Sequence, residues 1–215
     1  MMKLYSYWRS SCSYRVRIAL KLKRVEYQTI PIHLLRDGGE QHSAEYRALN
    51  PQQLVPLLVD GDFALGQSLA IFQYLEARLP QPALLPQDPR QAARMWSFCQ
   101  AIACEIQPLQ NTRLVQYLGQ ELGLDESARS AWLRHWIGLG LDALENELRG
   151  REASPYCYGD KPTYADCCLV PQMYAAERFG ALREWPRLQA IVARCRELPE
   201  FVAAHPDNQP DAQKT

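Results

Sequence analysis

Residues 3–32 read KLYSYWRSSCSYRVRIALKLKRVEYQTIPI, and this stretch predicts how the first part of the chain folds. Residues 3–7 are a strand candidate with aromatic and aliphatic side chains. A serine cluster at residues 10–13 precedes a helix that continues to about residue 23, and residues 25–32 are a second strand candidate. A strand, a helix and a strand within about 30 residues form a βαβ unit, which implies that the two strands are parallel.

The helix in this unit has an amphipathic pattern. Val16, Ala19 and Leu20 recur at the spacing of one helical face, which we expect to be buried. The basic residues that we expect on its solvated face are Arg17, Lys21 and Arg24. The pattern therefore predicts a helix that is buried on one side.

A proline-rich segment divides the chain. Before it, the sequence predicts a short helix at residues 43–49 and a hairpin at residues 57–65 around Asp60-Gly61-Asp62. A helix then begins at Ser68 and stops at Pro80. We expect an α/β thioredoxin-like domain (βαβ-ββα) at residues 1–80, a linker at residues 81–88 and an all-α domain at residues 89–215.

The second part is predicted to be helical throughout. The expected helices are residues 88–119 with a kink at Pro108, residues 125–149, residues 163–178 and residues 186–198. Thr163-Tyr164-Ala165-Asp166 matches a capping box before an apolar helix, so Asp166 is expected to be a buried cap and not an acid catalyst. The polar tail from His205 onward is expected to be poorly ordered.

Composition excludes several classes of function. The 24 basic and 24 acidic residues balance, whereas a nucleic-acid binder would show a basic surplus. The sequence has no secretory h-region and no apolar run of membrane-spanning length, so we expect no membrane partner. The seven cysteines are odd in number and lack zinc-ligand spacing, which predicts reduced thiols in a cytoplasmic protein without a metal.

The serine cluster is the first candidate site. The N–H groups and the positive dipole end at a helix start favour a bound anion. A free thiol titrates at about 8.5, and one hydroxyl hydrogen bond to its thiolate contributes about 1.5–3 kcal/mol. Ser10 could thus lower the pKa of a bound thiol by about one to two units, or it could be a plain helix cap.

Two further stretches could bind a peptide-like thiol. If the Val55–Pro56 bond is cis, the backbone of Val55 could pair with a ligand as an added strand, but a trans proline at a strand start fits equally well. At the next helix start, Ser68 and the backbone amides could hold a carboxylate, while Gln67 could bond an amino-acid head group. Each stretch alone is also explained by capping.

Together and in this order, the three stretches resemble the glutathione site of cytosolic glutathione transferases. Residues 10–20, SSCSYRVRIAL, resemble the signature of the zeta class, the maleylacetoacetate isomerases. Further similar stretches are residues 48–51, 67–71, 84–89, 106–111, 165–166, 169–172 and 176–179. The resemblance covers roughly residues 3–210 and implies the glutathione transferase fold, with glutathione as cofactor and a homodimer.

The resemblance also implies roles for individual residues. Ser10 would stabilise the thiolate, assisted by Ser11 and Cys12. The remaining residues that would bind glutathione are Ser13, Tyr14, Arg15, Gln41, Val55, Gln67, Ser68, Gln107 and Asn111. Arg178 and Arg9 would hold the carboxylates of a small acidic substrate, which suits the bidentate fork of arginine, although each could be a solvated surface charge. Cys12 could be a reactive thiol or a small apolar filler.

The implied activity is glutathione-dependent cis–trans isomerisation of maleylacetoacetate to fumarylacetoacetate in tyrosine and phenylalanine breakdown. Maleylpyruvate isomerases share much of the pattern, and a general glutathione transferase is another possible function. A non-catalytic interaction protein of the same fold is a different class, but such a protein is expected to lose the activating hydroxyl. Ser10, Gln67 and Ser68 are all present, which favours an enzyme.

Overall fold

The computed structural model describes residues 1–213, which divide into two compact units. The first unit contains residues 1–84 together with the last part of the chain from residue 196, and the second contains residues 85–195. The sequence suggested placing the last segment with the helical part. It lies with the first unit instead because the C-terminal helix packs on the first helix of the chain.

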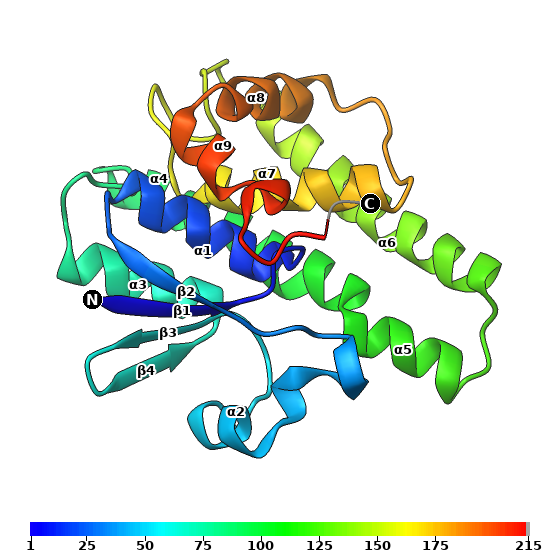
Figure 1. Cartoon of the computed structure of the whole chain (residues 1–215). Helices are drawn as coiled ribbons and strands as arrows, with labels where there is room; N and C mark the ends of the chain where they lie inside the picture. Colours follow the sequence, from blue (N-terminus) through cyan, green and yellow to red (C-terminus); the bar gives the residue numbers. More distant parts are fainter. Residues whose placement is uncertain (214–215) are drawn as a thin grey trace. The chain divides into compact units, whose positions relative to one another are not determined.

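The first unit is built on a four-stranded sheet of order β2-β1-β3-β4 (Figure 1). Its elements in chain order are β1 (Met2–Ser6), α1 (Ser11–Leu22), β2 (Tyr27–Pro31), α2 (Ala44–Leu49), β3 (Leu57–Asp60), β4 (Phe63–Gly66), α3 (Ser68–Arg78) and α9 (Pro199–Ala204). β1 pairs with β2 in parallel, as the βαβ pattern predicts, and Leu4 lies opposite Thr29. β3 is antiparallel to both β1 and β4, so the predicted hairpin is confirmed.

Helices α1 and α3 pack against each other, and α9 packs on α1. The predicted buried face of α1 is confirmed, since Val16, Ala19 and Leu20 are fully buried. The prediction that Arg17 faces solvent is wrong, because its side chain is also fully buried. The physical reason is that α1 is covered on a second side by α9, to which Arg17 is hydrogen bonded.

The second unit is helical. Its α-helices are α4 (Pro89–Gln100), α5 (Thr112–Gln120), α6 (Glu126–Arg149), α7 (Tyr164–Arg178) and α8 (Pro186–Arg196). The single kinked helix expected for residues 88–119 is instead interrupted by a π-helical turn (Ala101–Ile106) and a 3-10 turn (Gln107–Gln110). Pro108 lies in the second turn, where its ring and its missing N–H prevent a regular α-helix.

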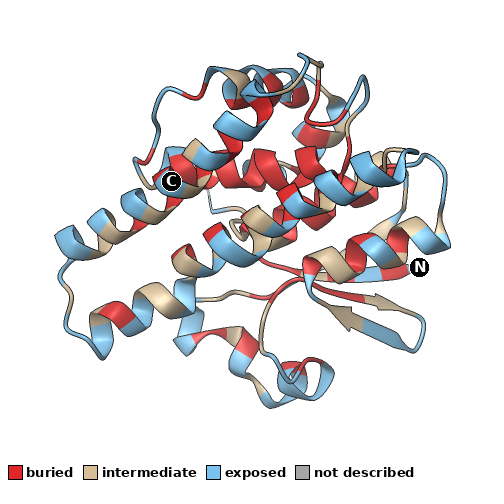
Figure 2. Ribbon diagram, turned by 180° about the vertical axis from the view of Figure 1, so that it is seen from behind, coloured by how far each residue is buried: buried red, intermediate tan, exposed pale blue. Residues whose placement is uncertain are grey.

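Helix α7 forms the core of the second unit, and twelve of its fifteen residues are buried. Figure 2 shows such buried positions in red and exposed ones in pale blue. Asp166 is fully buried and closes the predicted capping box at the start of α7. Its carboxylate accepts the N–H of Cys157 (2.9 Å) and both the N–H (2.8 Å) and the hydroxyl (3.0 Å) of Thr163. Burial raises the pKa of Asp166, although these hydrogen bonds act to lower it.

Within the described residues, the C-terminal segment forms a turn held by hydrogen bonds, contrary to the expected poorly ordered tail. Residues Pro206–Asn208 form a 3-10 turn, and the Gln209 side chain donates to the carbonyls of Ala203 (3.0 Å) and His205 (2.8 Å). The last two positions of the predicted tail lie outside the described residues. Within residues 1–213, no helix is long and apolar enough to cross a membrane.

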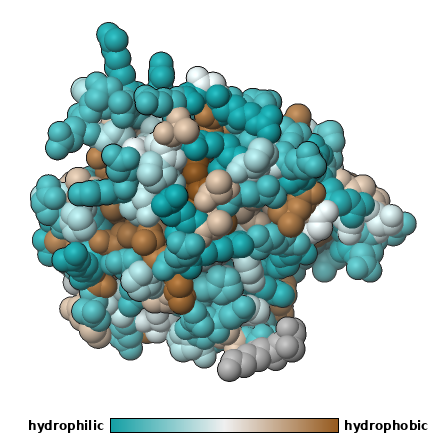
Figure 3. All heavy atoms as spheres, turned by 90° about the horizontal axis from the view of Figure 1, so that it is seen from above, coloured by the Kyte–Doolittle hydropathy of each residue, from teal (hydrophilic) through white to brown (hydrophobic). Residues whose placement is uncertain are grey.

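Most of the face in Figure 3 is hydrophilic, and hydrophobic atoms are interrupted by polar side chains. Among the described residues, nine large hydrophobic ones are exposed, and they come from separate parts of the chain between Met1 and Val202. Isolated exposed apolar side chains of this kind are ordinary on a protein surface.

Candidate functional site

Ser10 caps α1, and its hydroxyl oxygen accepts the backbone N–H of Ser13 at 3.2 Å. A hydroxyl can accept and donate at once, so this cap leaves the Ser10 hydrogen available for a bound anion. Ser11 and Cys12 occupy the first turn of the 12-residue helix; Ser11 is buried and Cys12 is half-buried. The structure therefore places a hydroxyl donor at the positive end of α1.

Ser13, Tyr14 and Arg15 are almost fully buried, at 0%, 1% and 1% exposure. The Ser13 hydroxyl accepts the N–H of Tyr7 (3.5 Å), and the Arg15 guanidinium donates to the hydroxyl of Ser68 (3.3 Å). Their side chains are closed to solvent, and the glutathione contacts expected for these three residues stay a prediction. They support the residues at the helix starts.

Ser68 is the first residue of α3 and is largely buried. Its oxygen accepts from Arg15, so its own hydrogen can be donated to a carboxylate beside the first N–H groups of the helix. Gln67 precedes it with a positive φ of 64°, which is uncommon for a residue with a side chain, and its amide donates to Gln52 (2.7 Å). Gln52 was not predicted, and its place in the Asn50-Pro51-Gln52-Gln53 turn was the signal that could have identified it.

The peptide bond between Val55 and Pro56 is cis. The carbonyl of Leu54 accepts hydrogen bonds from the Tyr46 hydroxyl (2.6 Å) and the Asn50 amide (2.8 Å), and burial raises the pKa of Tyr46 to about 12. In contrast, the N–H and C=O of Val55 make no hydrogen bond within residues 1–213. The chain is thus fixed at Leu54 and has a free backbone edge at the next residue, where an extended ligand could pair.

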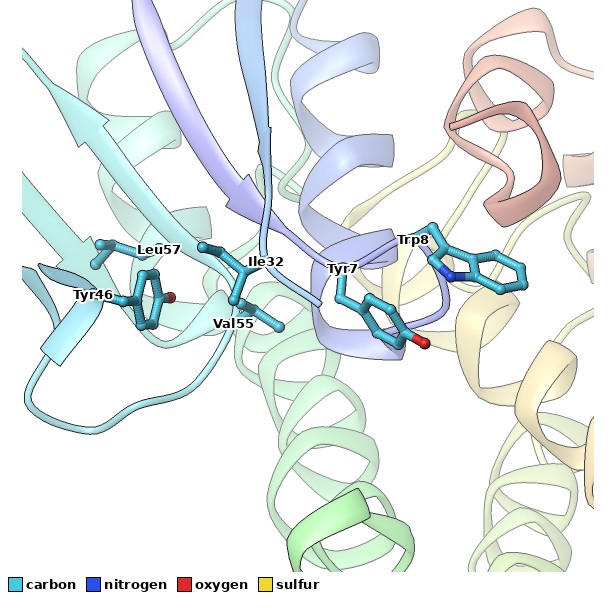
Figure 4. Close-up of a cluster of buried hydrophobic side chains, with 6 residues drawn as sticks. All are labelled: Tyr7, Trp8, Ile32, Tyr46, Val55 and Leu57. Atoms are coloured by element: carbon cyan, nitrogen blue, oxygen red, sulfur yellow. The ribbon is translucent and has the colours of Figure 1, made fainter. Parts of the chain in front are cut away.

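The side chain of Val55 belongs to a buried hydrophobic cluster, shown in Figure 4. The cluster consists of Tyr7, Trp8, Ile32, Tyr46, Val55 and Leu57. It joins the loop after β1, which leads to Ser10, to the loop before β3, which carries the free backbone of Val55. Packing therefore positions these two parts of the candidate site together.

Gln41 lies in a short 3-10 turn and is buried. Its amide nitrogen donates to the carbonyl of Leu34 (3.4 Å) and lies 3.1 Å from Nε2 of His42, whose Nδ1 lies 2.7 Å from Oε1 of Gln53. This chain of contacts links Gln41 to the residue two positions before Val55. His42 and Gln53 were not predicted, because short polar contacts between loops leave no periodic signal in a sequence.

The other predicted glutathione residues lie in the second unit. Asn111 caps α5 by accepting the N–H of Arg113 (3.1 Å), and Gln107 begins the preceding turn and is half-buried. A reciprocal pair of amide hydrogen bonds at 3.1 Å ties Gln110 in this turn to Gln172 of α7. This buried pair fixes the turn against the core helix of the second unit.

Each of the two predicted substrate arginines lies beside an aromatic ring. The guanidinium of Arg9, which is half-buried, lies 5.0 Å from the ring centroid of Trp8. Arg178 is exposed at the end of α7, 4.4 Å from the ring centroid of Phe179. Such contacts orient a guanidinium while its N–H groups still reach a carboxylate. Arg9 belongs to the first unit and Arg178 to the second, so each is described by itself.

The described part of the chain contains no cluster of side chains suited to bind a metal ion. Among residues 1–213, no group of three or more His, Cys, Asp or Glu side chains is arranged to hold a metal ion. The candidate site instead consists of hydroxyls, amides and free backbone groups at two helix starts and one loop.

Two domain models of one protein family match the chain. The family described as "Glutathione S-transferase, N-terminal domain" matches residues 4–83, and "Glutathione S-transferase, C-terminal domain" matches residues 137–199. Both the α/β part and the helical part of the chain therefore have relatives in one family.

Among curated proteins, the maleylacetoacetate isomerase of Pseudomonas aeruginosa is 50% identical over 98% of each chain. The probable maleylacetoacetate isomerase of Vibrio cholerae is 47% identical over 97% of each chain. The maleylpyruvate isomerase of a Ralstonia species is 45% identical, over 98% of this chain and all of its own. Names of both isomerases thus occur among close relatives.

Solved structures agree in fold. A holo maleylpyruvate isomerase, described as a bacterial glutathione S-transferase of the zeta class, matches with a TM-score of 0.95 and 44% identity, over 98% of this chain and all of its own. The maleylacetoacetate isomerase of Methylobacterium extorquens, solved with malonate and glutathione, matches with a TM-score of 0.94 and 37% identity, over 99% and 100%. The chain therefore belongs to the glutathione S-transferase family, and within it to the zeta-class isomerases that these relatives represent.

Proposed function

We propose that this protein is a glutathione-dependent cis–trans isomerase that converts maleylacetoacetate to fumarylacetoacetate. The observation that carries the proposal is the Ser10 hydroxyl at the start of α1, which still has a hydrogen to donate after capping the helix. The close relatives named maleylacetoacetate isomerase, and the solved relative that holds glutathione, support the assignment.

Glutathione is the cofactor that fits the groups of the first unit. The free N–H and C=O of Val55 suit the backbone of a small peptide. The hydroxyl of Ser68 and the start of α3 suit a carboxylate, and Gln67 suits an amino-acid head group. The cofactor's thiol would then be activated by Ser10, with Ser11 and Cys12 beside it in the first turn.

The proposed reaction is an addition followed by an elimination. The thiolate adds to the conjugated cis alkene, the C–S bond forms, and the electron pair moves to the carbonyl oxygen as an enolate. The former double bond is now single and can rotate. Return of the electron pair expels the thiolate and restores the alkene as trans, so glutathione is regenerated. The protein lowers the barrier by stabilising the thiolate and the enolate.

The second candidate is maleylpyruvate isomerisation. The 45% identical Ralstonia relative and the solved structure of TM-score 0.95 carry that name. The same chemistry serves both substrates because each is a cis-alkene diacid with a conjugated carbonyl. Arg9 and Arg178 are the proposed carboxylate-binding residues for either one.

Three further features belong to the proposal. We infer a homodimer in the cytoplasm that acts in tyrosine and phenylalanine breakdown, as suggested by the zeta-class relatives and the reduced cysteines. All seven cysteines lie among the described residues and none forms a disulfide, which fits a reducing compartment.

The test compares isomerisation of maleylacetoacetate and maleylpyruvate, each with glutathione, without it, and with S-methylglutathione, whose thiol is blocked. Turnover only with glutathione supports the mechanism, and equal rates without it refute the mechanism. A strong preference for maleylpyruvate would overturn only the substrate assignment.

A matched pair of variants tests the role of Ser10. Ser10→Ala removes both a cap and a thiolate donor, whereas Ser43→Ala removes only a cap, since Ser43 accepts the N–H of Tyr46 (3.1 Å) at the start of α2. We expect Ser10→Ala to raise the pKa of the bound thiol by about one to two units, from the loss of a hydrogen bond worth about 1.5–3 kcal/mol. Ser43→Ala should leave that pKa unchanged.

A further inference from the structure

Arg17 is a fully buried arginine whose guanidinium holds the loop between β1 and α1. Its Nη2 donates to the carbonyl of Trp8 (2.9 Å), and its Nη1 donates to the carbonyl of Tyr7 (3.4 Å) and the hydroxyl of Ser6 (3.2 Å). Its Nε donates to the carbonyl of Ala204 in the C-terminal helix (3.0 Å). One side chain thus joins the last residue of β1 and the next two residues of the loop to the end of α9.

This network leads directly to Ser10. The carbonyl of Tyr7, which accepts from Arg17, also accepts the backbone N–H of Ser10 at 3.0 Å. The hydroxyl oxygen of Ser10 in turn accepts the backbone N–H of Ser13, which fixes the position of the hydroxyl. The position of the proposed thiolate donor is therefore set by a chain of hydrogen bonds that begins at Arg17.

The same loop is held from its other side by the C-terminal segment. The carboxylate of Asp211 accepts the N–H of Trp8 at 3.0 Å. The Trp8 residue is thus fixed at its N–H by Asp211 and at its C=O by Arg17. Figure 1 shows the C-terminal segment, in red, beside the start of α1, and Figure 4 shows Tyr7 and Trp8 on the loop that follows β1.

We propose that Arg17 and Asp211 are positioning residues for thiol activation, which hold the Ser10 hydroxyl in place through the backbone of Tyr7 and Trp8. The inference rests on the proposed function, because its readout is the thiol of bound glutathione. Neither residue acts by touching glutathione or the substrate. Through Asp211 the C-terminal segment thus supports the loop that leads to Ser10, although Asp211 lies about 200 residues from Ser10 in the sequence.

Asp211 offers the cleaner test, because its side chain is half-buried, whereas that of Arg17 is fully buried. Asp211→Ala removes the acceptor of the Trp8 N–H, Asp211→Asn retains an acceptor oxygen, and Asp207→Ala removes an exposed carboxylate of the same segment that does not contact the loop. The measured quantities are the pKa of bound glutathione, from a titration of thiolate ultraviolet absorbance, and kcat and KM.

We expect Asp211→Ala to raise the pKa of the bound thiol by about half a unit to one unit, which lowers kcat below that pKa about three- to ten-fold. Asp211→Asn should restore most of the activity, and Asp207→Ala should match the wild type. KM for glutathione should change less than kcat, because neither Val55 nor Ser68 takes part in the hydrogen bonds that Asp211 and Arg17 make to the loop.

The direction of the change in the pKa of the bound thiol distinguishes a positioning role of Asp211 from a purely electrostatic one. If Asp211 acted only as a negative charge near the thiolate, its removal would lower the thiol pKa in both Asp211 variants. A lowered or unchanged pKa in Asp211→Ala overturns the inference. Arg17→Lys keeps the charge but cannot make the four hydrogen bonds, and it should also raise the thiol pKa; a wild-type pKa in a folded Arg17→Lys protein would likewise overturn it.

Failure of this inference can be told apart from failure of the proposed function. A wild-type protein that binds no glutathione thiolate would refute the proposed function, and a Ser10→Ala variant with an unchanged thiol pKa would refute the role of Ser10 in it. If Ser10→Ala behaves as expected while Asp211→Ala matches Asp207→Ala, only the positioning role is refuted.

Discussion

The stability of the second unit should depend strongly on Asp166, and Asp125 provides a matched control. Both aspartates cap helices of this unit: Asp166 lies in the capping box of α7, and Asp125 caps α6 by accepting the N–H of Ala128 (2.8 Å). They differ in burial, because Asp166 is fully buried whereas Asp125 is exposed. Replacing each by alanine separates the cost of losing a cap from the cost of a buried unpaired donor.

The expected loss in the free energy of unfolding follows from the hydrogen bonds that each substitution removes. Loss of an aspartate cap costs about 1 kcal/mol, which is the whole effect expected for Asp125→Ala, since water can bond the exposed N–H. Asp166→Ala also leaves the buried N–H of Cys157 unpaired, which adds about 1–3 kcal/mol. The raised pKa of Asp166 shows that burial disfavours its ionised form, and relief of that cost offsets part of the loss. The two costs sum to about 2–4 kcal/mol, and because of this offset we expect a loss towards the lower end of that range for Asp166→Ala.

Urea unfolding followed by tryptophan fluorescence measures this difference, since four of the five tryptophans lie in the second unit. In thermal unfolding, at about 2–4 °C per kcal/mol, these losses correspond to a fall in Tm of about 4–16 °C in Asp166→Ala and about 2–4 °C in Asp125→Ala. Isomerase activity per folded molecule should be unchanged in both. Equal destabilisation by the two substitutions would refute the burial argument, and a stable but inactive Asp166→Ala protein would show that Asp166 takes part in catalysis.

Two further predictions concern titratable side chains. Burial raises the pKa of Tyr46 from 10.0 to about 12. The contribution of Tyr46 to the free energy of unfolding is therefore complete below about pH 10 and should be lost as the pH rises towards 12. Tyr46→Phe should remove this loss at alkaline pH, as measured by urea unfolding, although it also removes the hydrogen bond to the carbonyl of Leu54. In the native protein a thiol reagent should modify Cys104 first and Cys12 more slowly, with glutathione protecting only Cys12, and Cys104→Ala should abolish the fast phase. The cysteines that should react only after unfolding are Cys99, Cys157, Cys167, Cys168 and Cys195, and a third thiol modified in the native state would contradict this.

Features written in local sequence were predictable. The βαβ unit, the hairpin, the helix starts at Ser10 and Ser68, and the capping box at Asp166 each rest on residues a few positions apart, and the structure contains all of them. Turn chemistry and helical periodicity act over such distances, so they leave a readable pattern.

Features that depend on contacts between distant segments were not predictable. Arg17 has the same charge and a similar spacing to Lys21, so periodicity alone places both on a solvated face. Arg17 is buried because α9 packs on α1 and because the loop after β1 lies against its guanidinium. In the same way, the polar composition of the C-terminal segment suggested disorder, whereas the segment forms a turn and the Asp211 carboxylate bonds to the distant loop after β1.

The two interpretations of Ser10, as a helix cap and as a thiolate donor, turn out not to compete. The cap uses an acceptor site on the hydroxyl oxygen, and thiolate binding uses the hydroxyl hydrogen, so one side chain can do both at once. Capping even assists the second role, because a hydroxyl held by the Ser13 N–H loses less rotational freedom when it meets a thiol. The statistical preference for serine at helix starts therefore could not decide the question. A functional role is favoured by the groups that accompany Ser10 in the first unit. These are the unpaired backbone groups of Val55, the Ser68 hydroxyl that accepts from Arg15, and the loop after β1, which Asp211 and Arg17 hold at Trp8.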